Sequence, residues 1–239
     1  MPGMGTLINV GAIIAGGLAG TLFGKRIEER YREIVLMAIG IASVFLGIAG
    51  AMEKMLQVED GKLVSGGSMM MIISLVLGSL IGEYLNIELH MEEFGEWLKR
   101  RSGNEGDVGF IHAFVTASLT VCIGAMAIVG SVRDGIYGDY SILAAKAVMD
   151  MLIIMAMTAS MGKGCIFAAV PVGMFQGAVT LVARLIEPLL TESALDNLSL
   201  VGSVLIFCVG VNLIRGKMFK VANMLPSIVV AAAWAFLPR

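Results

Sequence analysis

Residues 141–161 form an apolar run that carries two full charges, Lys146 and Asp150. At about 1.5 Å of rise per residue, a helix of this length crosses the hydrocarbon core of a bilayer. The two charges are four residues apart, which places both on one face of that helix. A carboxylate near the bilayer midplane costs about 3 kcal/mol on insertion scales, so it needs a partner charge, protein or water around it. The run therefore predicts an ion pair inside a transmembrane helix.

The composition supports this interpretation for the whole chain. Of the 239 residues, 57% are hydrophobic and 15% charged, whereas soluble domains have about 25% charged residues. A net charge of −2 without a long basic cluster argues against a nucleic-acid partner. Cys122, Cys165 and Cys208 lie in apolar runs without a CxxC motif, which argues against a disulfide framework and a zinc site. We expect a lipid bilayer as the partner, and no cofactor.

Eight apolar segments with short polar connections can be distinguished. They lie near 5–23, 34–52, 68–86, 109–131, 141–161, 164–186, 197–215 and 221–237. The predicted fold class is all-α: a polytopic membrane protein with about eight transmembrane helices in a single membrane domain, 1–239.

Basic residues alternate between the two sets of connections. Eleven follow the odd-numbered spans: Lys25, Arg26, Arg30, Arg32, Lys99, Arg100, Arg101, Lys163, Arg215, Lys217 and Lys220. Five lie on the other side: Lys54, Lys62, Arg133, Arg184 and Arg239. The positive-inside rule places the first set in the cytoplasm and both termini outside.

Residues 87–107 are predicted to lie on the cytoplasmic membrane surface. Ile87, Met91, Phe94 and Leu98 form one apolar stripe at helical spacing, with acidic residues between them and a basic end. Trp97 suits the headgroup region. This pattern is typical of an interfacial amphipathic helix over 87–101, followed by a loop.

The first and fourth spans contain further candidate residues. Small residues recur every four positions from Ala12 to Gly24, which favours close helix packing. Asn9 places a side-chain amide at membrane depth, where it binds either substrate or a neighbouring helix. Thr120 belongs to a hydroxyl-rich stretch that either bonds back to its own helix or lines a polar path.

The sixth span contains Pro171, followed shortly by Gln176. A proline inside a helix removes one hydrogen bond and displaces the carbonyl four residues earlier, here that of Phe167. Discontinuous helices of this kind occur at transporter binding sites. An ordinary proline kink is the alternative, and Pro226 repeats the feature in the eighth span.

A weak internal repeat relates the two ends of the chain. Residues 21–28 resemble 180–187, and 42–46 resemble 202–206, at offsets of 159 and 160. The match pairs a first three-helix repeat, 5–86, with a second, 164–237. The alternating topology gives the repeats opposite orientations, and inverted repeats are common in secondary transporters. The two central helices, 109–161, then form an insertion that carries Asp150.

Several stretches are also similar to a known family. They are 4–11 (MGTLINVG), 122–130 (CIGAMAIVG), Asp134-Gly135, 138–141 (GDYS) and 146–150 (KAVMD). These residues resemble the domain of unknown function 554 family, the YqgA/YdfK-like bacterial inner-membrane proteins, over nearly the whole chain. The resemblance implies a multi-pass protein of the bacterial cytoplasmic membrane. It also implies a suspected transport role without an agreed substrate.

These observations favour a secondary transporter for a small solute or ion, with proton or ion coupling through Asp150. Lys146, Asn9, Thr120, Gln176 and the Pro171 break would complete the pathway. The main alternative is a structural ion pair that only fixes helix register, in a structural or accessory subunit. A membrane-embedded enzyme is a weaker alternative, because the sequence lacks the usual catalytic motifs, such as HExxH and GxSxG. Soft-metal handling by the methionines of 149–161 is a further alternative. We expect a homodimer, because eight short spans offer a small core.

Overall fold

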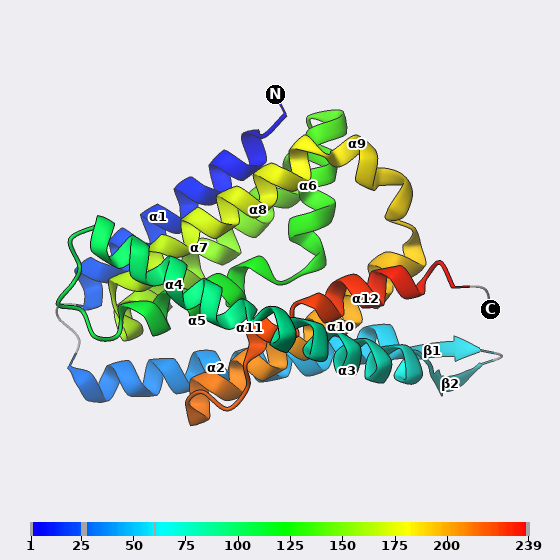
Figure 1. Ribbon diagram of the computed structural model, residues 1–239, viewed down its shortest axis with the longest axis horizontal. Helices are drawn as coiled ribbons and strands as arrows, with labels where there is room; N and C mark the ends of the chain where they lie inside the picture. Colours follow the sequence, from blue (N-terminus) through cyan, green and yellow to red (C-terminus); the bar gives the residue numbers. More distant parts are fainter. Residues whose placement is uncertain (1, 25–27, 60, 238–239) are drawn as a thin grey trace. The chain divides into compact units, whose positions relative to one another are not determined.

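The computed structural model describes residues 2–24, 28–59 and 61–237, which form helices and one small hairpin (Figure 1). The first helices are α1 (Met4–Gly24), α2 (Glu29–Met55), α3 (Ser68–Leu85), α4 (Ile87–Arg101), α5 (Phe110–Cys122), α6 (Ala125–Tyr137) and α7 (Ser141–Met161). A 3₁₀ segment, η1 (Lys163–Ala168), precedes α8 (Ala169–Leu181) and α9 (Ala183–Ile186). The chain ends with η2 (Glu187–Leu189), α10 (Glu192–Arg215), α11 (Val221–Met224) and α12 (Pro226–Trp234). Lys25, Arg26 and Arg239, which contribute to the count of basic residues, lie outside the described residues.

Six helical segments of the described chain are long and apolar enough to span a bilayer. They are Met4–Gly24, Glu33–Met55, Ser68–Leu85, Ser141–Met161, Lys163–Leu181 and Glu192–Arg215. The bent pair Phe110–Cys122 and Met126–Tyr137 makes a seventh if it is counted as one span. The predicted eighth span contains a shorter apolar helical stretch, Val221–Trp234. The chain is thus an all-α membrane protein with six or seven such spans.

Helix α1 shows how these helices distribute their side chains. Its buried positions are mostly glycines and polar residues, and they include Thr6 and Asn9. Its exposed positions include Leu7, Leu22 and Phe23, each at least 60% exposed. Large apolar side chains on the outside and small or polar ones on the inside suit a helix surrounded by lipid.

The chain divides into two compact units. Unit 1 comprises Met1–Ile39 and Leu89–Glu187, and unit 2 comprises Gly40–Glu88 and Pro188–Arg239. Each predicted three-helix repeat therefore contributes helices to both units. The single domain expected from the sequence stays a prediction.

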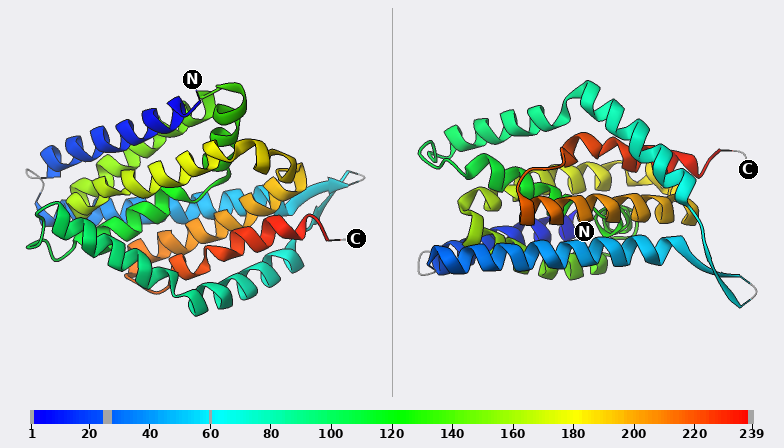
Figure 2. Two further views of the ribbon diagram at one scale, coloured as in Figure 1. Left: turned by 45° about the horizontal axis from the view of Figure 1, so that its top comes forward. Right: turned by 90° about the horizontal axis from the view of Figure 1, so that it is seen from below.

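In unit 1, α1 packs along α7 and along the η1–α8 segment. A Cβ on Gly16 would collide with the backbone carbonyl of Met151, and one on Gly24 would crowd Ala159. Later residues of α1 contact later residues of α7, so the two helices are parallel. Gly17 faces Ile166 while Gly173 faces Val10, so α1 and α8 run in opposite directions. Figures 1 and 2 show these three helices side by side.

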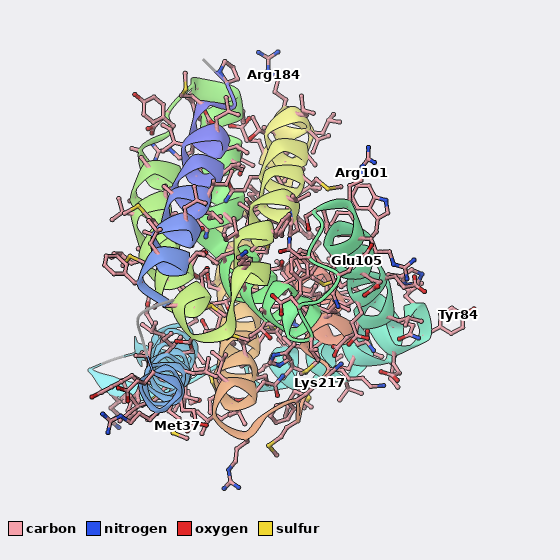
Figure 3. All side chains as sticks on the ribbon, turned by 90° about the vertical axis from the view of Figure 1, so that its left-hand side faces the viewer. Met37, Tyr84, Arg101, Glu105, Arg184 and Lys217 are labelled. Carbon is pink, nitrogen blue, oxygen red and sulfur yellow. The ribbon has the colours of Figure 1, made fainter. Side chains whose placement is uncertain are left out.

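Unit 2 contains two antiparallel helix pairs. Gly40 of α2 packs near Gly210 of α10, whereas Gly47 packs against the backbone of Phe207. Gly78 and Gly82 of α3 pack against Ser227 and Asn223 respectively, in the α11–α12 segment. Tyr84, 90% exposed, points outward from the same α3 helix (Figure 3). Glycine thus sets the close approach within each pair.

The amphipathic helix is confirmed as α4, which ends at Arg101, as predicted. Leu98 is buried, and Phe94 makes an edge contact with Phe114 of α5. Trp97 is more than half exposed. Two residues of the predicted apolar stripe, Phe94 and Leu98, therefore face protein in unit 1. The place of α4 on the cytoplasmic membrane surface stays a prediction.

The structure differs from the sequence expectation in the fourth span and adds a hairpin after α2. The fourth span, 109–131, is not one helix: α5 ends at Cys122, and α6 begins at Ala125 with a bend of 63°. Helix α6 continues to Tyr137, beyond the predicted end of this span at 131. Strands β1 (Leu56–Glu59) and β2 (Lys62–Ser65) form an antiparallel hairpin that the pattern of apolar runs does not predict.

The glycine contacts predict a contrast between two positions of α1. Gly16→Ala should destabilise the protein by about 1–3 kcal/mol, because the Cβ meets a backbone carbonyl that no rotamer change can move. Gly11→Ala, on the same helix with nothing within 4 Å of its Cβ, should be neutral or stabilising. Thermal unfolding in detergent measures both. Equal stability of the two variants would contradict the packing described here.

Candidate functional site

The predicted ion pair is present inside unit 1. Lys146 Nζ donates a hydrogen bond of 2.5 Å to Asp150 Oδ2, and the two residues are 7% and 3% exposed. Asn9 Nδ2 of α1 donates to the same carboxylate oxygen at 3.0 Å. Three of the residues singled out in the sequence therefore meet at one carboxylate.

Helix α7 positions the pair by turning its charged face inward. Lys146, Asp150, Ile154 and Thr158 are all buried at helical spacing. On the other side, Met149 is about half exposed, like Val148 and Leu152. The apolar face of α7 thus points outward while its ionic face points into the protein, as required at membrane depth.

Lys146 also binds the end of α5. Its Nζ donates to the backbone carbonyl of Val121 at 2.8 Å. The last carbonyls of an α-helix lack intrahelical donors, and a cation near them is favoured by the helix dipole. The ammonium group therefore links the carboxylate of Asp150 to the broken end of α5.

Gly124 makes that break possible. Its backbone has φ 145° and ψ 148°, a conformation that essentially only glycine adopts. Nothing lies within 4 Å of the position of a Cβ there, so the constraint is conformational and not steric. The sequence signal for the break was a glycine within an apolar stretch, which is too common in this chain to be distinctive.

Thr120 and Pro171 do not join the ion pair through any described hydrogen bond. Thr120 Oγ1 donates to the carbonyl of Thr116 in its own helix, which is the local alternative predicted for it. The helix changes type between Ala168 and Ala169, just before Pro171. Pro171 therefore directly follows a change from 3₁₀ to α-helix, and its role in a binding site stays a prediction. Pro171 stands in the first turn of α8, where a missing N–H costs little.

Gln176 is buried on α8, 1% exposed, and neither its Oε1 nor its Nε2 has a hydrogen-bond partner among the described residues. Gly164 contacts Phe110 near one end of α5, whereas Lys146 binds Val121 near the other. The two contacts make α5 antiparallel to α7 and parallel to α8. Gln176 follows Gly164 in the sequence by the same number of residues as Cys122 follows Phe110. Since α5 and α8 are parallel, Gln176 lies about level with the α5–α6 break.

Asp134 is a buried residue whose role the sequence did not indicate. It is fully buried on α6, and its Oδ2 accepts hydrogen bonds from the N–H groups of Gly3 and Gly5, at 3.1 and 2.9 Å. These N–H groups belong to the start of α1, where a carboxylate is favoured. Asp134 therefore anchors the helix that carries Asn9. Only an acid in an apolar helical context could have drawn attention to it.

A cavity of about 400 Å³ lies near the far end of α7 in unit 1. Its lining includes Thr21, Asp107, Thr158 and Lys163. Thr158 stands two turns beyond Asp150 on the same buried face of α7, about 12 Å along the axis. The cavity therefore lies at one end of the helix face that carries the ion pair.

Unit 2 has its own polar cluster, at the end of α3. Asn223 Nδ2 donates to Glu83 Oε2 at 2.7 Å, and Asn223 Oδ1 accepts from the N–H of Glu88 at 2.7 Å. Lys220 and Lys217 form ion pairs with Glu83 and Glu88, at 2.6 and 2.7 Å. The cluster fixes the turn between α3 and α4. The sequence did not predict it, because these residues come from opposite ends of the chain.

The fold and the site define a polytopic α-helical membrane protein with a buried, hydrogen-bonded ion pair. The chain belongs to the family described as "Protein of unknown function (DUF554)", which it matches over residues 4–236. It is 30% identical over 233 residues to "Uncharacterized membrane protein YdfK" of Bacillus subtilis (strain 168), covering 98% of this chain and 96% of that one. It is 31% identical over 239 residues to "Uncharacterized protein YqgA" of Escherichia coli (strain K12), covering 97% of each. No solved structure matches the chain.

The ion pair predicts a specific pattern of stability changes. Lys146→Met should destabilise the protein by about 3–5 kcal/mol, because it leaves the carboxylate of Asp150 buried without a counter-charge. The double variant Lys146→Met/Asp150→Leu should recover most of this loss, since no charge remains to desolvate. Chemical unfolding in detergent, analysed as a double-mutant cycle, measures the difference. A double variant less stable than the single one would contradict the assignment.

Proposed function

We propose that the protein is a secondary transporter of a small solute or ion, and that Asp150 carries the coupling proton or ion. The observation that supports this most is the Asn9–Asp150–Lys146 cluster, a charged network inside an apolar helix bundle. Ionisable groups at membrane depth are costly and mark ion and substrate pathways in membrane proteins. The network also reaches a broken helix, a frequent element of transporter sites.

Each residue has a role in this proposal. Asp150 binds and releases the proton. Lys146 balances its charge and ties the site to the end of α5, and Asn9 ties it to α1. Gln176 supplies unpartnered hydrogen-bonding groups level with the break. Thr120 and Pro171 have no described hydrogen bond to these residues, and their part in the pathway stays a prediction.

The cavity beside Thr158 suggests one route to the site. It is lined by hydroxyl groups, a carboxylate and an ammonium group, which suit water or a polar solute. The buried face of α7 connects it to Asp150 through Ile154, which is fully buried. In the proposed mechanism, rearrangement around Ile154 opens and closes this route.

The helix pairs support the proposed inverted repeat. Predicted spans 1 and 6 contact each other in antiparallel fashion, as do spans 2 and 7, and 3 and 8. Gly47 packs against Phe207, and these residues are 160 positions apart, the offset that relates 42–46 to 202–206. Equivalent residues facing each other across an antiparallel pair are expected where a twofold axis passes. We therefore propose two inverted repeats, 5–86 and 164–237, among eight spans, with a homodimer as the assembly.

Proton movement tests the proposed function. Liposomes containing the protein and a pH-sensitive dye should show proton flux under gradients of the transported solute or ion. Asp150→Asn should abolish that flux, because the amide cannot ionise. Asp139→Asn changes an acid outside the membrane-spanning helices, bonded to Arg133, and should leave the flux unchanged. Flux that survives in Asp150→Asn would remove Asp150 from the mechanism.

The proposed topology places the α2–α3 hairpin outside a cytoplasmic membrane and the α4–α5 loop inside. Lys62→Cys should react with a membrane-impermeant maleimide on intact cells, because Lys62 is exposed in β2. Ser102→Cys, exposed beyond α4, should react only after permeabilisation. The native cysteines are free, and Cys165 and Cys208 are buried, so background labelling should be low. The reverse labelling pattern would invert the topology.

A further inference from the structure

We propose that the transported solute is a small monoanion that moves together with one proton. This inference rests on the transporter role proposed above. It starts from the charges in the site, where Lys146 and Asp150 are each more than nine-tenths buried. The groups that contact them from neighbouring helices among the described residues are uncharged: the amide of Asn9, the carbonyl of Val121 and the nearby thiol of Cys122. A further buried carboxylate, Asp134 on α6, is bound instead by the N–H groups of Gly3 and Gly5. The resting site is therefore neutral as an ammonium–carboxylate pair.

A net charge in this environment is strongly unfavourable, so each loaded state should also be close to neutral. Two loaded states satisfy this condition. In the first, Asp150 takes up a proton and an anion balances Lys146. In the second, Lys146 loses its proton and a cation balances Asp150.

The contacts of Lys146 favour the first state. Its ammonium group has a second acceptor, the carbonyl of Val121, at the negatively polarised end of α5. This carbonyl continues to stabilise the ammonium group after the carboxylate of Asp150 is protonated. The second state would remove the charge from a group that two acceptors hold. The site therefore retains a positive charge for an anion to bind.

Unused hydrogen-bond donors near the site fit the same ligand. Gln176 Nε2 and Ser118 Oγ are buried without hydrogen-bond partners among the described residues, and so are two acceptor oxygens, Asn9 Oδ1 and Gln176 Oε1. Gln176 is level with the α5–α6 break, and Ser118 precedes Val121 by about one turn of α5. An anion accepts hydrogen bonds from such groups. The proton bound to Asp150 forms one O–H bond and is released with the anion, so the cycle is balanced without any other reactant.

The test imposes gradients of single ions on liposomes that contain the protein and an internal pH dye. The membrane potential is clamped with potassium and valinomycin. Sodium salts of chloride, nitrate, dihydrogen phosphate and lactate are compared with sodium sulfate at equal sodium, and protein-free liposomes are subtracted. At least one monoanion should acidify the interior several-fold faster than sulfate does.

The cation arm uses sulfates of lithium, sodium and ammonium. Protein-dependent alkalinisation by one of these cations, with no effect of any monoanion, would overturn the anion assignment while leaving a transporter that uses Asp150. No protein-dependent proton movement with any anion or cation would count against both proposals.

Variants separate the roles of the two charged residues. Asp150→Asn should lose anion-driven acidification but keep exchange of the labelled anion, because Lys146 remains as the anion-binding charge. Lys146→Met should lose both activities, and Lys146→Arg should retain the coupling. Loss of exchange in Asp150→Asn, while the variant still unfolds cooperatively, would contradict this division of roles.

Binding to the unmodified protein provides a measurement that does not depend on the folding of variants. Stabilisation against thermal unfolding by the active monoanion gives its dissociation constant at several pH values. If one proton is taken up with the anion, the dissociation constant rises about tenfold for each unit by which the pH increases, wherever Asp150 is ionised in the empty site. A dissociation constant that falls with increasing pH, or does not change, would overturn the proposal.

Discussion

The desolvation of Lys146 and Asp150 is the constraint that explains much of unit 1. Two charges inside an apolar bundle need each other, and their remaining hydrogen-bonding capacity needs further partners. Asn9 supplies one partner from α1, and the carbonyl of Val121 supplies another from α5. These contacts require α1 to approach α7 closely, which the glycines of α1 allow. The break after α5 leaves the carbonyl of Val121 for Lys146, so the pair and the irregular backbone depend on each other.

Parts of this arrangement follow from the sequence, because periodicity and composition are local properties. The apolar runs predict α1, α3, α7 and α10 closely, and the four-residue spacing of Lys146 and Asp150 places them on one face. Asn9 could be recognised as an amide that needs a partner. Its actual partner could not, because Asn9 and Asp150 are 141 residues apart in the chain.

The differences from the sequence prediction have a separate physical origin. Pro171 looked like a helix breaker, yet it stands in the first turn of α8, after a change from 3₁₀ to α-helix. Gly124 looked like one more glycine of an apolar helix, yet its backbone conformation ends α5. The hairpin of 56–65 had a recognisable signal in Asp60-Gly61, a dipeptide typical of tight turns. Long apolar runs do not indicate strands of only four residues, so the hairpin has no counterpart among the predicted spans.

The two units have different polar centres, and this difference bears on function. The cluster around Asn223 in unit 2 joins Lys217 and Lys220, each about half exposed, to the buried Glu88 and the exposed Glu83 at a turn. Water therefore solvates three of these four charged groups. A pair of this kind contributes little energy and fixes local geometry. The Lys146–Asp150 pair in unit 1 is not solvated in this way, because both residues are buried beside helices whose outer faces are apolar. A purely structural link there could be made by apolar side chains at lower cost. The proposed exchange of protons and solute rests on this contrast, a titratable carboxylate buried beside unpartnered hydrogen-bonding groups.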